Sequence, residues 1–237
     1  GQASPNAVLT TRSVSARSSP AADIREFNQR LSKWESAGSA TGLHGNREET
    51  CLPERAKRGN GLMPLDPESL HDLDWLNKKA SDVFFEEAPR YPEIADLIAA
   101  LHPRWLLDVG CGAGYTAKLL KSRVPGIAIH GVDISSVALQ RARAHVDQVW
   151  RVDLDKSELP VPSGRYDTVA CVEVLEHLYD PDHALQEIAR ALVPGGHAVL
   201  TVPNLAYWRF RLELLRGRVP PPAVDRRHLH QFDMRLL

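Results

Sequence analysis

The chain has 237 residues, and its 29 Lys and Arg nearly balance its 30 Asp and Glu, which gives a formal net charge of −1. This balance and the lack of a basic face argue against nucleic acid as a partner. No run of eighteen apolar residues occurs, so we expect no membrane span. The length and the apolar content predict a soluble globular protein with one full core and a small appendage.

The cysteines bear on the compartment in which the protein works. Cys51, Cys111 and Cys171 are an odd number at wide spacing, which argues against a disulfide framework. A reducing cytoplasm is therefore the expected location. The sequence does not indicate an oligomeric state.

The first ninety residues are expected to form a tail and a cap. Residues 1–22 are rich in Ser, Ala and Thr and contain no acid, which predicts a disordered tail; the same composition suits an organelle transit peptide, although no amphipathic face is clear. Residues 23–90 are expected to form a helical cap or lid, with a capping box at Asp23 and Glu26 and a second helix that starts at Pro67. Four aromatic side chains are candidates for a lid over the site or, alternatively, for core packing: Trp75, Phe84, Phe85 and Tyr91.

The most informative segment is an apolar strand that leads into a glycine-rich loop at residues 106–116. Gly110, Gly112 and Gly114 tolerate positive φ and leave no Cβ between the backbone and a ligand, so main-chain N–H groups can approach it closely. Asp108 adds a fixed negative charge at the carboxyl end of the strand. This pattern is typical of a nucleotide-type cofactor site.

The spacing of the glycines indicates which cofactor binds. A dinucleotide fingerprint requires G-x-G-x-x-G, and its third glycine is replaced here by Tyr115. An acid two residues before the first glycine would repel a pyrophosphate and suits a cationic ligand. A sulfonium-bearing amino acid therefore fits better than NAD.

This segment resembles motif I of the class I S-adenosylmethionine-dependent methyltransferases. The resemblance implies that the cofactor is S-adenosyl-L-methionine and that the loop contacts it. The residues that would take part are Asp108, Gly110, Cys111, Gly112, Ala113, Gly114 and Tyr115.

A second acid follows the next apolar run, at residues 127–132. Asp133 lies about twenty residues after the glycines, where a second parallel strand would deliver an acid to a ribose. A carboxylate accepts two vicinal hydroxyls at once, so Asp133 and the adjacent Ile134 are expected at the cofactor. The alternative role for Asp133 is a helix N-cap, for which Ser135 and Ser136 compete.

A short alternating strand is expected at residues 148–152, followed by Asp153 and Leu154. In the resembled family an acid at this place faces the adenine amino group, and the next apolar residue flanks the ring. The alternative is an ordinary turn acid before Asp155.

Residues 166–172 predict a buried strand, which is followed by Glu-Val-Leu-Glu-His-Leu-x-Asp-Pro at residues 173–181. This sequence is similar to motif IV of the same family, especially of its small-molecule and ubiquinone-pathway branches. Asp180 can cap the next helix. Parallel strands present their carboxyl ends to one side, so Glu173 and His177 are expected on the same rim as the glycines.

A Pro-Gly-Gly turn precedes a fifth strand at residues 197–202. Right-handed crossovers stack five such β-α units into one sheet with helices on both faces. The predicted fold is therefore α/β: a Rossmann-like doubly wound sheet of the class I methyltransferase type, with five parallel strands and an N-terminal helical extension. Residues 91–237 would form the S-adenosylmethionine-binding domain.

The carboxyl end departs from the family pattern. A complete member adds a helix and a two-stranded antiparallel edge after the fifth strand, but only about 35 residues follow Val202. We therefore expect a truncated chain, or a degenerate domain whose fifth strand is exposed at the sheet edge. The segment that starts at Asp225 and contains His228 resembles a "D-R-x-H-L-x-x-F" segment of some relatives.

Methyl transfer from a sulfonium is an in-line displacement to which the protein mainly contributes positioning. A base is needed only if the acceptor must lose a proton, and His177 is the first candidate. Glu173 and His228 follow it, with Glu176 behind them; alternatively, His177 packs against the cofactor without proton transfer. No metal is expected, because His228 and His230 have no third ligand nearby in the sequence.

The sequence thus predicts transfer of a methyl group to a small-molecule acceptor, with an oxygen as the expected nucleophile. The alternative is a non-catalytic module on the same fold, which binds S-adenosylmethionine or a partner protein. An oxidoreductase or a sugar epimerase on a similar sheet is a more distant alternative, and NADH binding would favour it.

Overall fold

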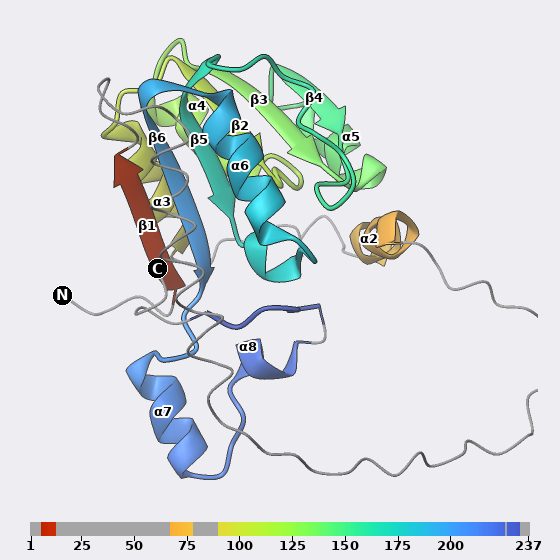
Figure 1. Cartoon of the computed structure of the whole chain (residues 1–237), viewed down its shortest axis with the longest axis vertical. Helices are drawn as coiled ribbons and strands as arrows, with labels where there is room; N and C mark the ends of the chain where they lie inside the picture. The colour runs from red at the N-terminus through yellow and green to blue at the C-terminus, as the bar shows by residue number, and fades with distance from the viewer. Residues whose placement is uncertain (1–5, 13–66, 78–89, 226, 233–237) are drawn as a thin grey trace, which may run out of the picture.

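The computed structural model describes residues 6–12, 67–77, 90–225 and 227–232. One six-stranded sheet, in the order β1-β6-β5-β2-β3-β4, forms the centre of the molecule (Figure 1). Strands β2 to β6 pair in parallel, and β1 pairs antiparallel with β6. This sheet with its flanking helices confirms the predicted Rossmann-like α/β fold.

The elements follow one another as alternating strands and helices after an N-terminal strand and two helices. They are β1 (Asn6–Arg12), α2 (Pro67–Asn77), α3 (Arg90–Ala99), β2 (Trp105–Val109), α4 (Tyr115–Arg123), β3 (Ala128–Asp133), α5 (Ser136–Ala142), β4 (Gln148–Arg151), β5 (Tyr166–Val172), the 3-10 turn η2 (Leu175–His177), α6 (Pro181–Ala191), β6 (Leu192–Pro203), α7 (Trp208–Leu215) and α8 (Pro221–Val224). The helices of the described residues are too short or too polar to cross a bilayer.

The strand order reverses in the middle of the sheet. From β2 the chain continues outward through β3 and β4, and it then returns to the other side of β2 to form β5 and β6. The loops after β2 and β5 therefore diverge between two neighbouring strands, which is where open α/β sheets bind ligands. This reversal places the glycine loop and residues 173–180 at one edge of the sheet.

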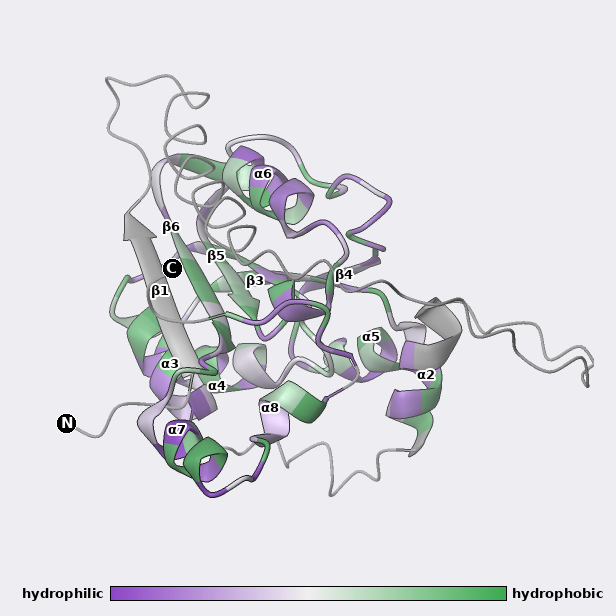
Figure 2. Ribbon diagram, turned by 60° about the horizontal axis from the view of Figure 1, so that its bottom comes forward, coloured by the Kyte–Doolittle hydropathy of each residue, from purple (hydrophilic) through white to green (hydrophobic). Residues whose placement is uncertain are grey.

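Helices cover both faces of the sheet (Figure 2). The central strands β2 and β5 are therefore mostly buried, whereas the edge strand β4 is partly exposed. Helix α6 packs on one face through Ala184, Ile188 and Ala191. Helices α3, α4 and α5 cover the opposite face, as Figure 1 also shows for α3 and α6. Their buried apolar side chains are Ile94, Ala95, Ile98, Ala117, Leu120, Leu139 and Ala142.

Two helix N-termini are capped by side chains. The Asp180 carboxylate accepts a hydrogen bond from the His183 N–H at 3.0 Å, and Pro181 is the first residue of α6 as predicted. The Ser135 hydroxyl caps α5 by accepting from the Ala138 N–H at 3.1 Å. Ser135 thus takes the cap position for which Asp133 was the alternative.

Strand β1 corrects two expectations. Its backbone pairs with β6 from Asn6 opposite Pro203 to Arg12 opposite His197, so an exposed edge at the fifth strand and a disordered tail over residues 6–12 are both wrong. The free N–H and C=O groups of an edge strand accept a further strand from distant sequence. The only local signal is the run of Val8, Thr10 and Thr11, whose side chains favour strands.

Two expectations concern the carboxyl-terminal part: a Pro-Gly-Gly turn before the fifth strand, and no antiparallel strand pair after it. The Pro-Gly-Gly segment lies inside β6, beside a register shift between Tyr166 and Thr168, and does not precede the strand. After β6 the described residues contain only one isolated bridge, between Asn204 and Phe232. Some expectations fall in residues 13–66 and 78–89, which lie outside the described residues. They concern the helix expected from Asp23, the lid candidates Phe84 and Phe85, and Cys51.

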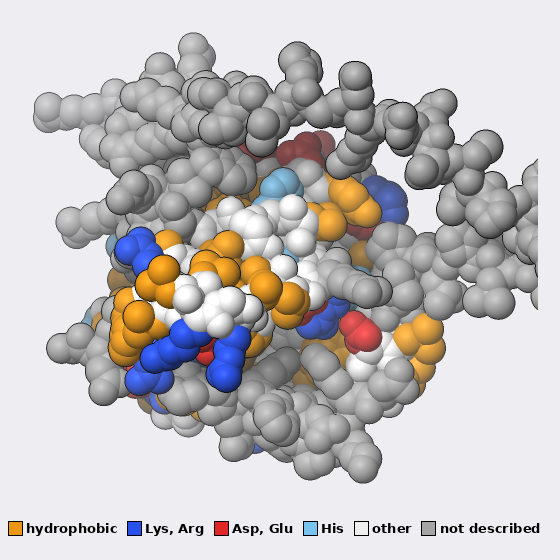
Figure 3. Space-filling view, turned by 90° about the horizontal axis from the view of Figure 1, so that it is seen from below, with side chains coloured by type: hydrophobic (Ala, Val, Ile, Leu, Met, Phe, Trp, Pro, Cys, Tyr) orange, Lys and Arg blue, Asp and Glu red, His pale blue; other side chains and the backbone are white. Residues whose placement is uncertain are grey.

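Helices α7 and α8 lie beyond the carboxyl end of β6 and bury no side chain fully. Trp208 is 53% exposed and Leu215 is 84% exposed. Figure 3 shows hydrophobic and basic side chains together on this side of the molecule. Arg209, Arg211, Arg216 and Arg218 are the exposed basic residues of the segment.

A close packing contact behind the glycine loop gives a first prediction. A Cβ at Gly131 of β3 would lie 2.7 Å from the Cys111 Sγ, so Gly131→Ala should lower the free energy of unfolding by about 1 to 3 kcal/mol. Cys111→Ala removes the clashing sulfur, so the double variant should lose less than the sum of the single losses. Urea unfolding of the four proteins measures this coupling. Strictly additive losses would contradict the contact.

Candidate functional site

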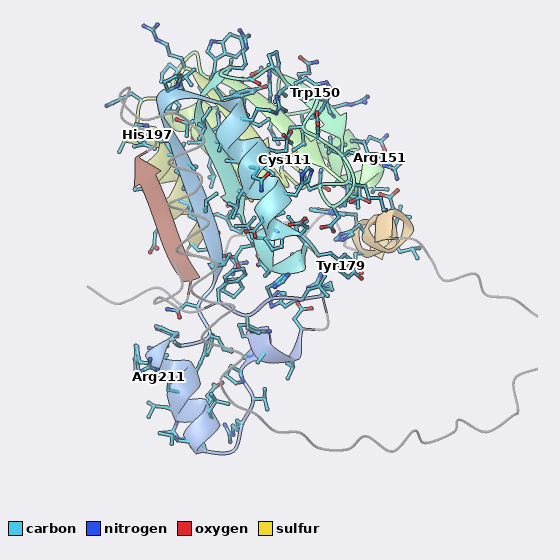
Figure 4. The ribbon with its side chains drawn as sticks, in the orientation of Figure 1. Cys111, Trp150, Arg151, Tyr179, His197 and Arg211 are labelled. Carbon is cyan, nitrogen blue, oxygen red and sulfur yellow. The ribbon has the colours of Figure 1, made fainter. Side chains whose placement is uncertain are left out.

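A cavity of about 280 Å³ opens at the carboxyl edge of the sheet. The loops after β2, β3, β4 and β5 form its floor and walls, and α2 contributes from outside. Figure 4 shows Tyr179, which is 75% exposed, at this edge between α6 and α2. The lining residues that the sequence predicted as site residues are Gly110, Gly112, Asp133, Ile134, Asp153, Leu154, Glu173 and His177.

The glycine loop presents bare backbone to this cavity. Gly110, Gly112 and Gly114 have φ values of 74°, 51° and 80°, a region that favours glycine. A Cβ at Gly110 would overlap Val174 Cγ2, and a Cβ at Gly112 would lie 3.1 Å from the Trp75 ring. Glycine therefore keeps open a narrow space between the loops of β2 and β5 and helix α2.

Asp133 connects the glycine loop to the end of β3. Its Oδ2 accepts the Gly112 N–H at 2.8 Å, and its Oδ1 accepts the Ser135 N–H at 2.9 Å. Burial raises the pKa of Asp133, while these two backbone donors oppose that shift. A carboxylate has further lone pairs, so Asp133 can brace the loop and still accept a ligand hydroxyl from the cavity.

Asp153 is a turn acid that also lies at the cavity. Its Oδ1 accepts the Asp155 N–H at 3.1 Å, and Lys156 Nζ lies 2.5 Å from its Oδ2, as expected of a turn acid. It also lines the cavity, together with the buried side chain of Leu154. The turn thus holds the carboxylate at the cavity wall.

Other predicted residues of the glycine loop do not line the cavity and support the loop from behind. Asp108 is 2% exposed, and Gly114 is the N-cap of α4. Burial raises the pKa of the Cys111 thiol well above its usual range, so Cys111 acts as a packing residue. Ala113 packs in a small cluster with Trp75 and Ala138, and Tyr115 lies edge-on to Tyr91 with ring centroids 5.5 Å apart.

Glu173 has an unusual backbone conformation at the end of β5. Its φ of 56° is uncommon for a residue with a side chain and is costly unless its surroundings fix it. The Thr201 hydroxyl donates to Glu173 Oε1 at 3.0 Å, and Arg90 Nη1 lies 3.9 Å from Oε2. Burial raises the pKa of Glu173, and the Arg90 charge opposes this.

His177 and His228 meet although they are far apart in the sequence. Their ring centroids lie 4.9 Å apart. His177 Nδ1 lies 3.0 Å from the Arg227 carbonyl, and His228 Nδ1 lies 2.9 Å from the Pro222 carbonyl. His228 Nε2 lies 3.7 Å from Asp225 Oδ2. A carbonyl only accepts hydrogen bonds, so each Nδ1 carries a proton, and a neutral His177 ring has its lone pair on Nε2. Burial lowers the pKa of His177, which favours this neutral form.

Glu176 lies beneath these two rings. Its side chain is 1% exposed, and neither carboxylate oxygen has a hydrogen-bond partner among the described residues. Burial, together with the nearby Glu173 charge, raises the pKa of Glu176 to about 8. Its backbone carbonyl accepts the N–H groups of Leu229 and His230 at 2.7 and 3.2 Å, which docks the segment that carries His228.

Glu176, His177 and His228 each offer one possible metal ligand, and these three atoms lie within 4.8 Å of one another. The sequence predicted no metal and compared only His228 with His230. His230 is not part of this group. The third potential ligand, His228, comes from a remote segment, which no spacing rule along the chain could indicate.

Helix α2 contributes lining residues that the sequence missed or left undecided. Trp75, a lid candidate, lines the cavity with His71 and Asp74. Asp72 anchors the helix, since its two carboxylate oxygens accept the hydroxyls of Ser135 and Ser136 at 2.6 and 2.7 Å. These contacts join elements separated by some sixty residues, so they leave no local sequence signal.

Arg227 is a further lining residue that the sequence did not single out. Its guanidinium lies 2.7 Å from Asp225 Oδ2 and 3.5 Å from Asp74 Oδ2. It therefore links the C-terminal segment to α2 across the cavity mouth. In the sequence, only its position next to the candidate His228 could have indicated that Arg227 lies at the site.

A doubly wound sheet with a bare glycine loop and buried acids at its strand reversal defines an α/β protein with a nucleotide-type cofactor site. The chain belongs to the methyltransferase domain family, whose model matches residues 84–235. S-adenosylmethionine is the methyl donor of the class I members of this family.

Curated relatives include two ubiquinone biosynthesis O-methyltransferases. The chain is 36% identical over 120 residues to that of Alkalilimnicola ehrlichii, covering 48% of each chain. It is 29% identical over 153 residues to that of Acinetobacter baylyi, covering 59% of this chain and 63% of the relative. The chain thus spans about half to two thirds of the length of these relatives. An S-adenosylmethionine-dependent methyltransferase structure from Mesorhizobium loti matches with 27% identity and a TM-score of 0.38, covering 44% of this chain and 51% of that one.

The residues at the cavity fit this cofactor. A Cβ at Gly112 would narrow the space between the loop and Trp75, so the absence of a side chain keeps a cradle for a ligand. Asp133 and Glu173 are acids on opposite walls, which suits a ligand with ribose hydroxyls and positive charge.

The buried carboxyl of Glu176 gives a pH-dependent prediction. Its pKa of about 8 in the folded chain exceeds the ordinary 4.5, so the native chain should lose stability as pH rises between these values. Glu176→Gln cannot ionise and should gain stability over the native chain in that window, by on the order of 4 kcal/mol between pH 5 and pH 8. Urea unfolding in EDTA at both pH values measures this gain.

The matched control is Glu187, a second buried carboxyl with the opposite shift. The Arg190 hydrogen bond lowers the pKa of Glu187, so Glu187→Gln should lose stability above pH 4.5. An equal effect of the Glu176 substitution at pH 5 and pH 8 would count against an ionisable, unpaired Glu176.

Proposed function

We propose that this chain binds S-adenosylmethionine in the cavity at the carboxyl edge and transfers its methyl group to an oxygen of a small-molecule acceptor. The observation that carries the proposal is that two sets of predicted site residues line the same cavity. One wall has the bare glycine loop and Asp133, and the other has Glu173 and His177. The names of the curated relatives, which are O-methyltransferases, support an oxygen as the nucleophile.

In this proposal the wall below α2 holds the cofactor. Asp133 accepts the ribose hydroxyls, and its bonds to the Gly112 and Ser135 N–H groups fix its orientation. Ile134, Asp153 and Leu154 take the adenine side, as the family resemblance implies. The cofactor supplies a methyl group already activated by the sulfonium, so the protein's task is to position the acceptor.

The opposite wall handles the acceptor and its proton. Glu173, His177 and His228 are the candidate proton acceptors, and the neutral His177 ring has its lone pair on Nε2. Holding the reactants in near-attack geometry contributes about 7 to 11 kcal/mol in favourable cases. Trp75 and Tyr91 line the cavity and suit a planar or aromatic acceptor.

We place this activity in a reducing compartment, the cytoplasm. Cys111 and Cys171 are buried and free of disulfides, which supports this location. We also propose that α2 belongs to a cap over a methyltransferase domain of residues 91–237. Its anchoring through Asp72 supports that division.

Removal of the Asp133 carboxylate tests the cofactor site. Asp133→Ala should weaken S-adenosylmethionine and S-adenosylhomocysteine binding by about 1.5 to 3 kcal/mol, the range for a hydrogen bond to a charged group. Isothermal titration measures both affinities. The matched control is Asp147→Ala: Asp147 accepts the Ile129 N–H at 2.7 Å near the amino end of the strands, so its loss should leave both affinities unchanged. Equal weakening by both substitutions would remove Asp133 from the site.

Loss of the His177 ring tests turnover separately from binding. His177→Ala should lower methyl transfer to hydroxyl acceptors by about 100-fold or more, with unchanged S-adenosylhomocysteine affinity. The control is His183→Ala on α6, whose ring lies near the Ser157 carbonyl and does not line the cavity. Tight cofactor binding without turnover on a panel of phenols and catechols would favour the alternative of a non-catalytic binding module.

A further inference from the structure

We propose that Glu176, His177 and His228 form a binding site for a divalent transition-metal cation beside the cofactor cavity. The three ligand atoms lie within 4.8 Å of one another. Three ligands at about 2.1 Å from one ion lie about 3.0 to 3.6 Å apart, so the group needs to close by about 1 to 2 Å.

The buried Glu176 carboxylate is the first reason. It is 1% exposed, and both of its oxygens lack a hydrogen-bond partner among the described residues. A buried carboxyl group without a hydrogen-bond partner is costly in either protonation state, and buried carboxylates are normally paired or bound to a cation. The described residues place no Lys or Arg in an ion pair with Glu176. A cation between Glu176 and the two rings would satisfy it.

The fixed tautomers of the two histidines are the second reason. Each Nδ1–H donates to a backbone carbonyl, that of Arg227 for His177 and that of Pro222 for His228. Metal-binding histidines almost always donate their second ring N–H in this way, which orients the ring and makes the other nitrogen more basic. The two backbone contacts therefore leave the Nε2 atoms as the possible metal ligands; that of His228 lies 3.7 Å from Asp225 Oδ2.

The fold holds the two ligand segments together without help from a cation. The Glu176 carbonyl accepts the N–H groups of Leu229 and His230, and the Leu205 N–H donates to the Phe232 carbonyl at 3.1 Å. These hydrogen bonds hold the residues that directly follow His228. Such preorganisation lowers the cost of bringing remote ligands around an ion.

The ligand chemistry indicates the class of cation. Two imidazoles and one carboxylate suit Mn²⁺, Fe²⁺, Co²⁺ and Zn²⁺, whereas Mg²⁺ and Ca²⁺ prefer oxygen ligands. Three protein ligands leave coordination positions open, as in catalytic zinc sites. Of the three ligands His177 lines the cavity, as Glu173 does, so an open position beside His177 would face the acceptor.

The use of such a cation in methyl transfer rests on the proposed function, whereas cation binding itself does not. A hydroxyl of the acceptor that reaches the cation becomes more acidic, and its proton passes to the Glu173 carboxylate. The oxygen lone pair then forms the bond to the methyl carbon while the carbon–sulfur bond pair returns to sulfur, which leaves as a neutral thioether. In this step the two histidines bind the cation, and Glu173 accepts the proton.

Mn²⁺ titration of the EDTA-stripped full chain, followed by electron paramagnetic resonance, tests the site without cofactor or acceptor. We expect one bound Mn²⁺ per chain and a rise in melting temperature on binding. Glu176→Gln and His228→Ala should each weaken Mn²⁺ binding at least tenfold. The matched control is His230→Ala, two residues from His228 and outside the ligand group, which should bind Mn²⁺ like the native chain.

Two outcomes would overturn the site: no stoichiometric Mn²⁺ binding to the native chain, or equal Mn²⁺ affinity of the native, Glu176→Gln and His228→Ala proteins. A parallel titration with S-adenosylhomocysteine separates this result from the proposed function. Mn²⁺ binding without cofactor binding would support the cation site and contradict the methyltransferase proposal. Cofactor binding without Mn²⁺ binding would support the cofactor site of the proposed function and contradict the cation site.

Discussion

The reversal of strand order between β2 and β5 is the constraint on which the rest of the structure depends. These strands are hydrogen-bonded neighbours, yet the chain leaves them in opposite directions, so the loops at their carboxyl ends diverge. The opening receives bare glycine backbone from one side and the Glu173–His177 segment from the other. Helix α2 and the C-terminal segment close this opening from outside and supply Trp75 and Arg227 to its lining.

The two buried acids at this opening, Asp133 and Glu176, differ in their hydrogen-bond partners. Asp133 is satisfied by backbone N–H groups of Gly112 and Ser135, so it can be buried and still brace the loop. The segment that carries His228 docks on the backbone of Glu176, and the Glu176 carboxylate oxygens have no hydrogen-bond donor among the described residues. The burial of Asp133 is thus explained by backbone donors, whereas that of Glu176 is the observation from which the cation site is proposed.

The sequence predicts those strands and helices in which the spacing of apolar residues agrees with the positions that the fold buries. The strand at residues 166–172 was predicted with the bounds that β5 has, because its apolar run at residues 169–172 is typical of a strand buried on both faces. Strand β1 was missed, because its pairing with β6 uses backbone groups that every residue has. The Asp72 contacts with Ser135 and Ser136 were missed for a related reason, since they join remote segments through short polar side chains.

The sequence by itself determined the five parallel strands, the glycine loop and the acids at the strand ends, because strand periodicity is local and parallel strands place their carboxyl ends at one edge. Only the tertiary structure decided which of these residues face the cavity and which, like Cys111 and Tyr115, support the loop from behind. It alone brought His228 to Glu176 and His177, because that contact depends on how the last segment docks after the sheet has formed. Spacing along the chain carries no information about such a contact, since its hydrogen bonds close a long loop between distant segments.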